Sequence, residues 1–183
     1  MEIIASPVEM QRWSDNARRR GETIAFVPTM GFLHEGHLTL MREGRKLCSR
    51  LASSLFVNPT QFGPNEDFAR YPRNFERDCE LMRTVPVDVL FAPEADVMFP
   101  LGSQTWVEAT EVTKGLCGDH RPGHFRGVTT VVAKLFNIVS PTPRSSARRI
   151  FSSCARSSGW WSISISTSRL FRLRLCANRM ASR

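Results

Sequence analysis

The sequence predicts an α/β domain built on a mostly parallel sheet that is flanked by helices. Short apolar runs recur along the first 140 residues, and segments with helical spacing lie between them. Strands that alternate with helices in this way are typical of parallel sheets, whose ligands bind beyond the carboxyl ends of the strands. At 183 residues, the chain is long enough for one full-sized domain with its own core.

The expected elements can be placed in order along the chain. The strands are short, mostly apolar runs that end at or just before a proline, and they are expected at 23–28, 51–58 and 87–93. The first helix is expected to begin near His34, because Leu38 and Met41 follow with helical spacing. Further helices are expected at 74–85 and 128–140. The β-branched start of the last segment also fits a strand, so both interpretations stay open there.

Charge is distributed very unevenly along the chain. The net charge is +8, but residues 141–183 contain nine arginines, no lysine and no acidic residue. The preceding 140 residues carry 16 basic and 17 acidic groups. The body is therefore near neutral, and the high isoelectric point belongs to the tail.

Composition also bears on the compartment. Five cysteines without a CxxC pair predict reduced thiols rather than a disulfide framework or a zinc ribbon. No apolar run is long enough to span a membrane, and the first residues lack the pattern of a signal peptide. A cytoplasmic protein without a membrane partner is expected.

Two loops that follow predicted strands should meet in one crevice. PTMGFLHEGH (28–37) follows the first strand and NPTQFGPNEDF (58–68) follows the second. Within the first loop, His34 and His37 lie three residues apart at the start of a helix, so both can face one ligand. Free backbone N–H groups and the helix dipole at this position favour an anion such as phosphate.

Two other interpretations of the histidine pair have to be weighed. Zinc-binding helices usually place histidines at i and i+4 with a glutamate between them, and His120 and His124, which could complete a metal set, lie on a distant loop. A lone HxxH is by default a pair of ordinary surface histidines. Spacing alone leaves the choice between surface histidines and a phosphate site open.

Longer strings resemble a known family. FVPTMGFLHEGHLTLM, SLFVNPTQFGPNEDFARYPR, VLFAPEADVMFP and RPGHFRGVTTVVAKLFNIV are similar, in order, to the pantothenate synthetase (pantoate–β-alanine ligase) family of the HxGH nucleotidyltransferase superfamily. The similarity covers residues 1–140. It implies a Rossmann-like fold, a homodimer and a two-step ligation. Pantoate attacks the α-phosphate of ATP, and β-alanine then displaces AMP from pantoyl adenylate, with Mg²⁺ neutralising phosphate charge.

The resemblance also implies roles for individual residues. It places ATP along one continuous stretch: Met30, Gly31, Phe32, Leu33, His34, Glu35, Gly36 and His37. His34 and His37 would stabilise the transition state, and His37 is the implied general acid. Gln61 and Asn58 would bind pantoate and β-alanine, while Asp67 is a candidate Mg²⁺ contact in a site to which no metal ligand is firmly assigned.

Two roles remain open for Arg121 and His124. The resemblance places Arg121 and His124 in a loop near the pocket. A plain loop role fits these residues equally well.

The resemblance stops at residue 140. The family continues with P-D-x-x-x-F-G-E-K-D-x-Q-Q-L, whose Lys and Asp complete the ATP site, whereas this chain reads SPTPRSSARRIFSSC. Permitted codons for Ser140–Cys154, read two nucleotides later, encode PDAALFGEKDFQQL. In the same offset, Leu175–Ser182 can encode VREPDGLA. We therefore expect a frameshift near residues 139–141.

A frameshift has consequences for domains and activity. Residues 1–140 are expected to form the N-terminal part of a Rossmann-like nucleotide-binding domain. Residues 141–183 are expected to be an aberrant, irregular Ser- and Arg-rich tail, with the rest of the domain and the C-terminal domain absent. The chain as written is expected to be inactive.

Two alternative functions also have to be weighed. The clustered arginines, with Trp160, Trp161 and Phe171 nearby, could form a nucleic-acid-binding tail. No recognised binding motif surrounds them, so a nucleic-acid partner is not expected. Another HxGH nucleotidyltransferase is disfavoured by the NPTQF and RPGHF segments.

Overall fold

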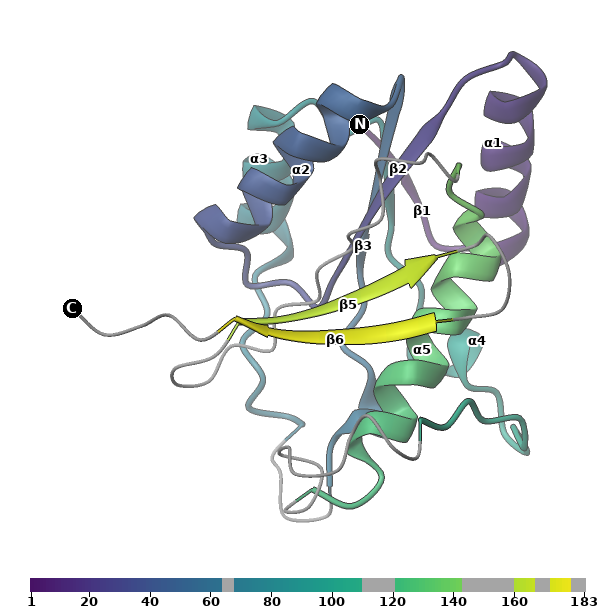
Figure 1. The fold of residues 1–183 in the computed structure, drawn as a ribbon, viewed down its shortest axis with the longest axis vertical. Coiled ribbons are helices and arrows are strands. Elements are labelled where there is room, and N and C mark those ends of the chain that lie inside the picture. The colour runs from purple at the N-terminus through teal and green to yellow at the C-terminus, as the bar shows by residue number, and fades with distance from the viewer. Residues whose placement is uncertain (64–67, 110–120, 143–159, 167–171, 179–183) are drawn as a thin grey trace.

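The structure of the chain is a computed structural model that describes residues 1–63, 68–109, 121–142, 160–166 and 172–178 (Figure 1). Its main sheet has four parallel strands in the order β1-β4-β3-β2. These strands are β1 (Glu2–Ile4), β2 (Ile24–Thr29), β3 (Arg50–Leu55) and β4 (Val89–Phe91). The predicted mostly parallel sheet is confirmed.

Helices cover both faces of this sheet. The longer helices are α1 (Pro7–Arg19), α2 (Glu35–Leu47), α3 (Phe75–Thr84) and α5 (His124–Val139), with short helices η1 (Pro59–Gln61) and α4 (Ala95–Met98) between them. Figure 1 shows α2 and α3 on one side and α1 and α5 on the other. Two separate apolar clusters are consistent with this arrangement. One contains residues of α2 and α3, and the other contains residues of α1 and α5. The body is a three-layer α/β/α arrangement.

All three predicted strands and all three predicted helices are present. The helix expected at 128–140 begins earlier, at His124, and the strand interpretation of its start is wrong. Its apolar residues bury one face against β2, and Phe136 contacts Phe26 edge to face at 5.5 Å between ring centroids. Burial against the sheet therefore outweighs the low helix propensity of its β-branched residues.

The first strand and helix were not predicted. The side chain of Ser6 caps α1 by accepting a hydrogen bond from the Glu9 N–H at 3.4 Å, and Pro7 occupies the first helical position. This is a standard N-terminal helix signal. In β1 only Ile4 is buried, so three residues carry too little pattern to predict a strand.

In the tail, the structure differs from the expected irregular chain. The segments β5 (Trp160–Ser166) and β6 (Arg172–Asn178) pair as antiparallel strands. The alternation W-S-I-S-I-S and R-L-R-L supplies a period of two, which is a strand pattern. No helix in the described part of the chain is long and apolar enough to cross a membrane.

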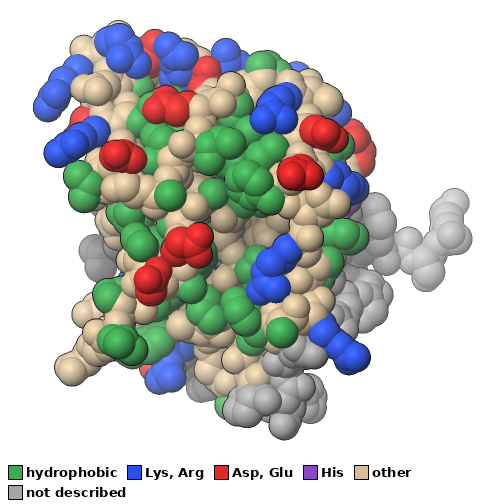
Figure 2. Space-filling model, turned by 180° about the vertical axis from the view of Figure 1, so that it is seen from behind, with side chains coloured by type: hydrophobic (Ala, Val, Ile, Leu, Met, Phe, Trp, Pro, Cys, Tyr) green, Lys and Arg blue, Asp and Glu red, His purple; other side chains and the backbone are tan. Residues whose placement is uncertain are grey.

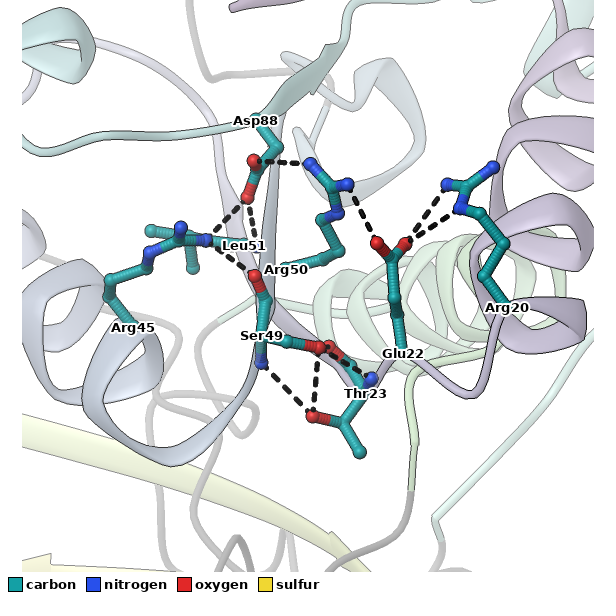
Figure 3. Close-up of polar contacts among 8 residues, drawn as sticks. All are labelled: Arg20, Glu22, Thr23, Arg45, Ser49, Arg50, Leu51 and Asp88. Atoms are coloured by element: carbon teal, nitrogen blue, oxygen red, sulfur yellow. Dashed lines mark hydrogen bonds and ion pairs between the residues drawn. The ribbon is translucent and has the colours of Figure 1, made fainter.

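Ion pairs tie the amino ends of the central strands together (Figure 3). Asp88, just before β4, accepts hydrogen bonds from Arg45, Arg50 and the Leu51 N–H. Arg50 also donates to Glu22 at 2.7 Å, and the hydrogen bonds from Arg50 and Arg20 lower the pKa of Glu22 to about 2. The charged side chains at this end of the sheet therefore pair with one another.

On the face in Figure 2, acidic and basic side chains are interspersed, as expected for a near-neutral body.

Candidate active site

Two loops meet at the carboxyl ends of β2 and β3. The turn after β2 contains Met30, and η1 follows β3. The Gln61 side-chain nitrogen contacts Met30 Sδ at 2.7 Å, so the predicted convergence is confirmed for these residues. Asp67, the candidate Mg²⁺ contact, lies outside the described residues.

The turn after β2 has an unusual backbone that a buried carboxylate supports. Gly31 and Phe32 both have positive φ angles, 90° and 51°. Asp78 on α3 is only 1% exposed, and its two oxygens accept hydrogen bonds from the N–H groups of Phe32 (2.7 Å) and Leu33 (2.8 Å). Asp78 was not predicted as a site residue, because no spacing signal links it to a turn 45 residues earlier.

The two histidines cap α2 with their own rings. His34 is the N-cap, and its Nδ1 accepts a hydrogen bond from the Gly36 N–H at 3.1 Å. The Nδ1 of His37 accepts one from the His34 N–H at 3.3 Å. This is a capping box made from histidines. Because a ring nitrogen that accepts from an N–H carries no proton, each neutral ring holds its proton on Nε2.

Burial sets the charge of His37. The side chain of His37 is 7% exposed, and its ring centroid lies 4.1 Å from that of His34. Burial, with a smaller contribution from the neighbouring His34, lowers the pKa of His37 to about 4. His37 is therefore neutral near pH 7 and acts there as a hydrogen-bond donor rather than a cation.

The expectation of free backbone N–H groups at this turn needs correction. The N–H groups of Phe32 and Leu33 bind Asp78, and those of His34 and Gly36 bind the ring nitrogens. These four donors are satisfied within the chain. These four amides are therefore not available to an anion.

A dense hydrogen-bond network fixes η1. Asn58 is 1% exposed, and its Oδ1 accepts hydrogen bonds from the N–H and hydroxyl of Thr60. Its Nδ2 donates to Gln61 Oε1 at 3.3 Å and to the Gly127 carbonyl at 3.1 Å. Gln61 therefore turns its oxygen toward Asn58 and its NH₂ toward Met30, which makes it a donor at the site.

The start of α5 holds η1 from the other side. His124 is 4% exposed, and its Nδ1 donates to the Gln61 carbonyl at 2.7 Å. Its Nε2 lies 3.0 Å from Arg121 Nη1, which can only donate. The neutral His124 ring thus has its proton on Nδ1, unlike the rings of His34 and His37. Of the two roles left open for Arg121 and His124, these contacts favour the one near the pocket.

A metal centre is the other chemistry that the histidines could serve. Within the described residues, no group of three or more His, Cys, Asp and Glu side chains is placed to hold a metal ion. His120 lies outside the described residues, and His124 is committed to Gln61 and Arg121.

Fold and site together define a Rossmann-like α/β protein in which the helix between β2 and β3 begins at an HxGH histidine pair. The family model for pantoate-beta-alanine ligase matches residues 2–145. The chain belongs to the pantoate-beta-alanine ligase family.

Individual relatives agree. Over 141 residues, the chain is 62% identical to pantothenate synthetase from Geobacter sulfurreducens, in a match that covers 77% of this chain and 50% of the relative. The chain thus spans about half the length of the curated relatives that it matches. These matches do not favour the nucleic-acid-binding alternative.

Solved structures show the same fold. A pantothenate synthetase from Thermus thermophilus matches with a TM-score of 0.71 and 44% identity, covering 77% of this chain and 50% of that one. A pantoate-beta-alanine ligase from Francisella tularensis, complexed with beta-gamma ATP and beta-alanine, matches with a TM-score of 0.71 and 38% identity. That comparison covers 77% of this chain and 54% of the other.

Proposed function

We propose that residues 1–140 form the ATP-binding part of a ligase that joins pantoate to β-alanine. In the first step the pantoate carboxylate attacks the α-phosphate of ATP, which forms pantoyl adenylate and releases pyrophosphate. In the second step the β-alanine amine attacks the activated carbonyl, loses a proton and displaces AMP. Family membership and the ATP- and β-alanine-bound relative support this proposal.

The observation that carries the proposal is the His34–His37 pair, with a neutral His37, at the carboxyl edge of the sheet. In its neutral form each ring carries its proton on Nε2, and the start of α2 adds the positive end of its dipole. Phosphate oxygens are the complementary acceptors. An anion that accepts a hydrogen bond from His37 favours its charged form, so ATP binding should raise its pKa from about 4. His37 would then approach the range in which a general acid works near neutral pH.

For the acid substrate, we assign the donor to Gln61 and the support to Asn58. The NH₂ group of Gln61 faces Met30, where it could donate to a carboxylate or hydroxyl oxygen of pantoate. Asn58 uses both of its amide atoms inside the chain, so its proposed role is to orient Gln61. The remaining residues of the 30–37 stretch would line the nucleotide.

Mg²⁺ would enter with ATP as part of the substrate and neutralise phosphate charge. The described residues contain no acidic cluster that would hold the ion by itself. Asp67 remains a proposed contact. A homodimer and a cytoplasmic location, both expected above, also remain predictions.

Conservative variants test the nucleotide site. His34→Asn with His37→Gln keeps good N-cap and N3 residues, so α2 should still begin at the same place while both ring donors are lost. Titration calorimetry with MgATP should show an affinity reduced by about tenfold or more, because each hydrogen bond to a charged group contributes about 1.5–3 kcal/mol. Glu43→Gln, at the exposed end of α2, is the matched control and should bind like the parent chain. Unchanged affinity in the double variant would exclude the proposed ATP site.

Activity requires a separate test, because the tail does not read as the family's Lys- and Asp-containing segment. We propose that the 183-residue chain lacks ligase activity and that a single-base correction near codon 140 restores it. Pantothenate formation from pantoate, β-alanine and ATP should be measured for both proteins. Activity of the uncorrected chain, or a nucleotide sequence in which no single-base shift encodes GEKDFQQL, would refute the frameshift.

A further inference from the structure

The turn that carries the histidine pair is held from α3 by two adjacent side chains. Gly31 and Phe32 adopt positive φ angles, and for a non-glycine residue such as Phe32 this conformation costs on the order of 1 kcal/mol. Such a conformation persists only where the surroundings fix it. The almost fully buried carboxylate of Asp78 fixes this conformation by accepting hydrogen bonds from the N–H groups of Phe32 and Leu33.

The carboxylate also packs directly against the turn. A Cβ atom on Gly31 would lie 3.0 Å from Asp78 Oδ2 and 3.3 Å from Leu55 Cδ2. No side chain larger than hydrogen fits between the turn and the carboxylate without displacing one of them. The close approach and the two hydrogen bonds therefore depend on each other.

Arg77 holds the same turn from the next position of α3. Its Nη1 donates to the Leu33 carbonyl at 3.2 Å, and its guanidinium carbon lies 5.4 Å from the centre of the Phe32 ring. Leu33 is thus bound through its N–H by Asp78 and through its carbonyl by Arg77. The peptide that leads into the helix cap has little freedom to rotate.

We propose that Asp78, assisted by Arg77, is a positioning residue for the nucleotide site. Leu33 directly precedes His34, whose N–H in turn donates to the His37 ring. Fixing Leu33 therefore fixes the cap that orients both Nε2–H groups. The link from Asp78 to the rings stands on geometry alone, while its effect on ATP rests on the proposed function.

Asp78→Asn in the full chain tests this link. The substitution is nearly isosteric, but one oxygen becomes an NH₂ group that faces a backbone N–H. Hydrogen exchange of a peptide covering residues 28–37 should accelerate by about tenfold or more relative to a reference peptide covering β3. In ¹⁵N spectra of the imidazoles, His34 and His37 should change from one tautomer, protonated on Nε2, to a mixture.

Asn74→Ala is the matched control in the same helix. The Asn74 side chain caps α3 by accepting from the Arg77 N–H at 3.1 Å, so its loss weakens α3 without removing a contact to the turn. It should leave the imidazole tautomers unchanged. Should Asp78→Asn fail to fold, Arg77→Met provides the second variant, with a smaller acceleration of exchange confined to the same peptide.

Each outcome decides a different point. Equal exchange in Asp78→Asn and Asn74→Ala, or unchanged tautomers in a variant whose turn exchanges faster, would overturn the positioning role. A wild-type chain that binds no MgATP would refute the proposed function, while exchange and tautomers would still decide the role of Asp78. Where the parent binds MgATP, Asp78→Asn should weaken its affinity by about tenfold and Asn74→Ala should not.

Discussion

The buried neutral state of His37 makes the stability of the chain depend on pH in a defined window. Its pKa is about 4 in the folded chain and close to 6.5 when unfolded, so the unfolded state binds more protons between these values. The contribution of His37 to the free energy of unfolding is fully present above about pH 6.5 and is lost as the pH decreases toward 4. The linkage relation gives a loss of about 2 kcal/mol at pH 5 and about 3 kcal/mol below pH 4.

His37→Gln isolates this contribution, because glutamine is a standard capping-box residue that does not titrate. Urea unfolding of both proteins at about pH 7.5 and pH 5 should show that the parent loses about 2 kcal/mol more than the variant. Other titrating groups are common to both proteins and cancel in this difference. Equal losses would mean that His37 is not held neutral by burial.

Two further predictions concern the packing around the site. Ser53 and Ser54 are neighbouring, fully buried residues of β3, but Ser53 donates to a β2 carbonyl at 2.8 Å, whereas the Ser54 hydroxyl has no hydrogen-bond partner among the described residues. In urea unfolding, Ser54→Ala should raise the free energy of unfolding by about 1 kcal/mol and Ser53→Ala should lower it by a similar amount; changes of the same sign would contradict this. A Cβ on Gly127 would lie 2.4 Å from the Thr60 carbonyl oxygen, so Gly127→Ala should push η1 away and cost about 1–3 kcal/mol. Gly63→Ala, with open space around it, should change stability by less than about 0.5 kcal/mol, and an equal effect of both would refute the clash.

The central fold could be predicted because its signals are local. The buried strands β2, β3 and β4 are apolar runs, and α2 and α3 bury one face each. The missed β1 is an edge strand of three residues with one buried side chain, so its sequence carries almost no pattern. The missed α1 did carry a capping signal, which consists of Ser6 and Pro7.

The site could be predicted only where its residues form a continuous motif. The histidine pair and Gln61 lie in recognisable strings after two strands, and the structure brings these strings together. Asp78 and Gly127 belong to the same site but come from other helices. Asp78 acts through hydrogen bonds from two backbone N–H groups, and Gly127 acts by having no side chain. Neither role produces a periodic pattern in the sequence.

The two ends of the sheet use charge in opposite ways. At the amino end, arginines and carboxylates neutralise one another, and Asp88 alone accepts from two arginines and a backbone N–H. At the carboxyl end, Asp78 takes up the N–H groups of the turn, and the histidine rings take up those of the cap. A bare helix terminus would bind any small anion through its amides. Because these four amides are already occupied, the proposed recognition of polyphosphate oxygens would depend on the rings of His34 and His37, whose orientation the cap fixes.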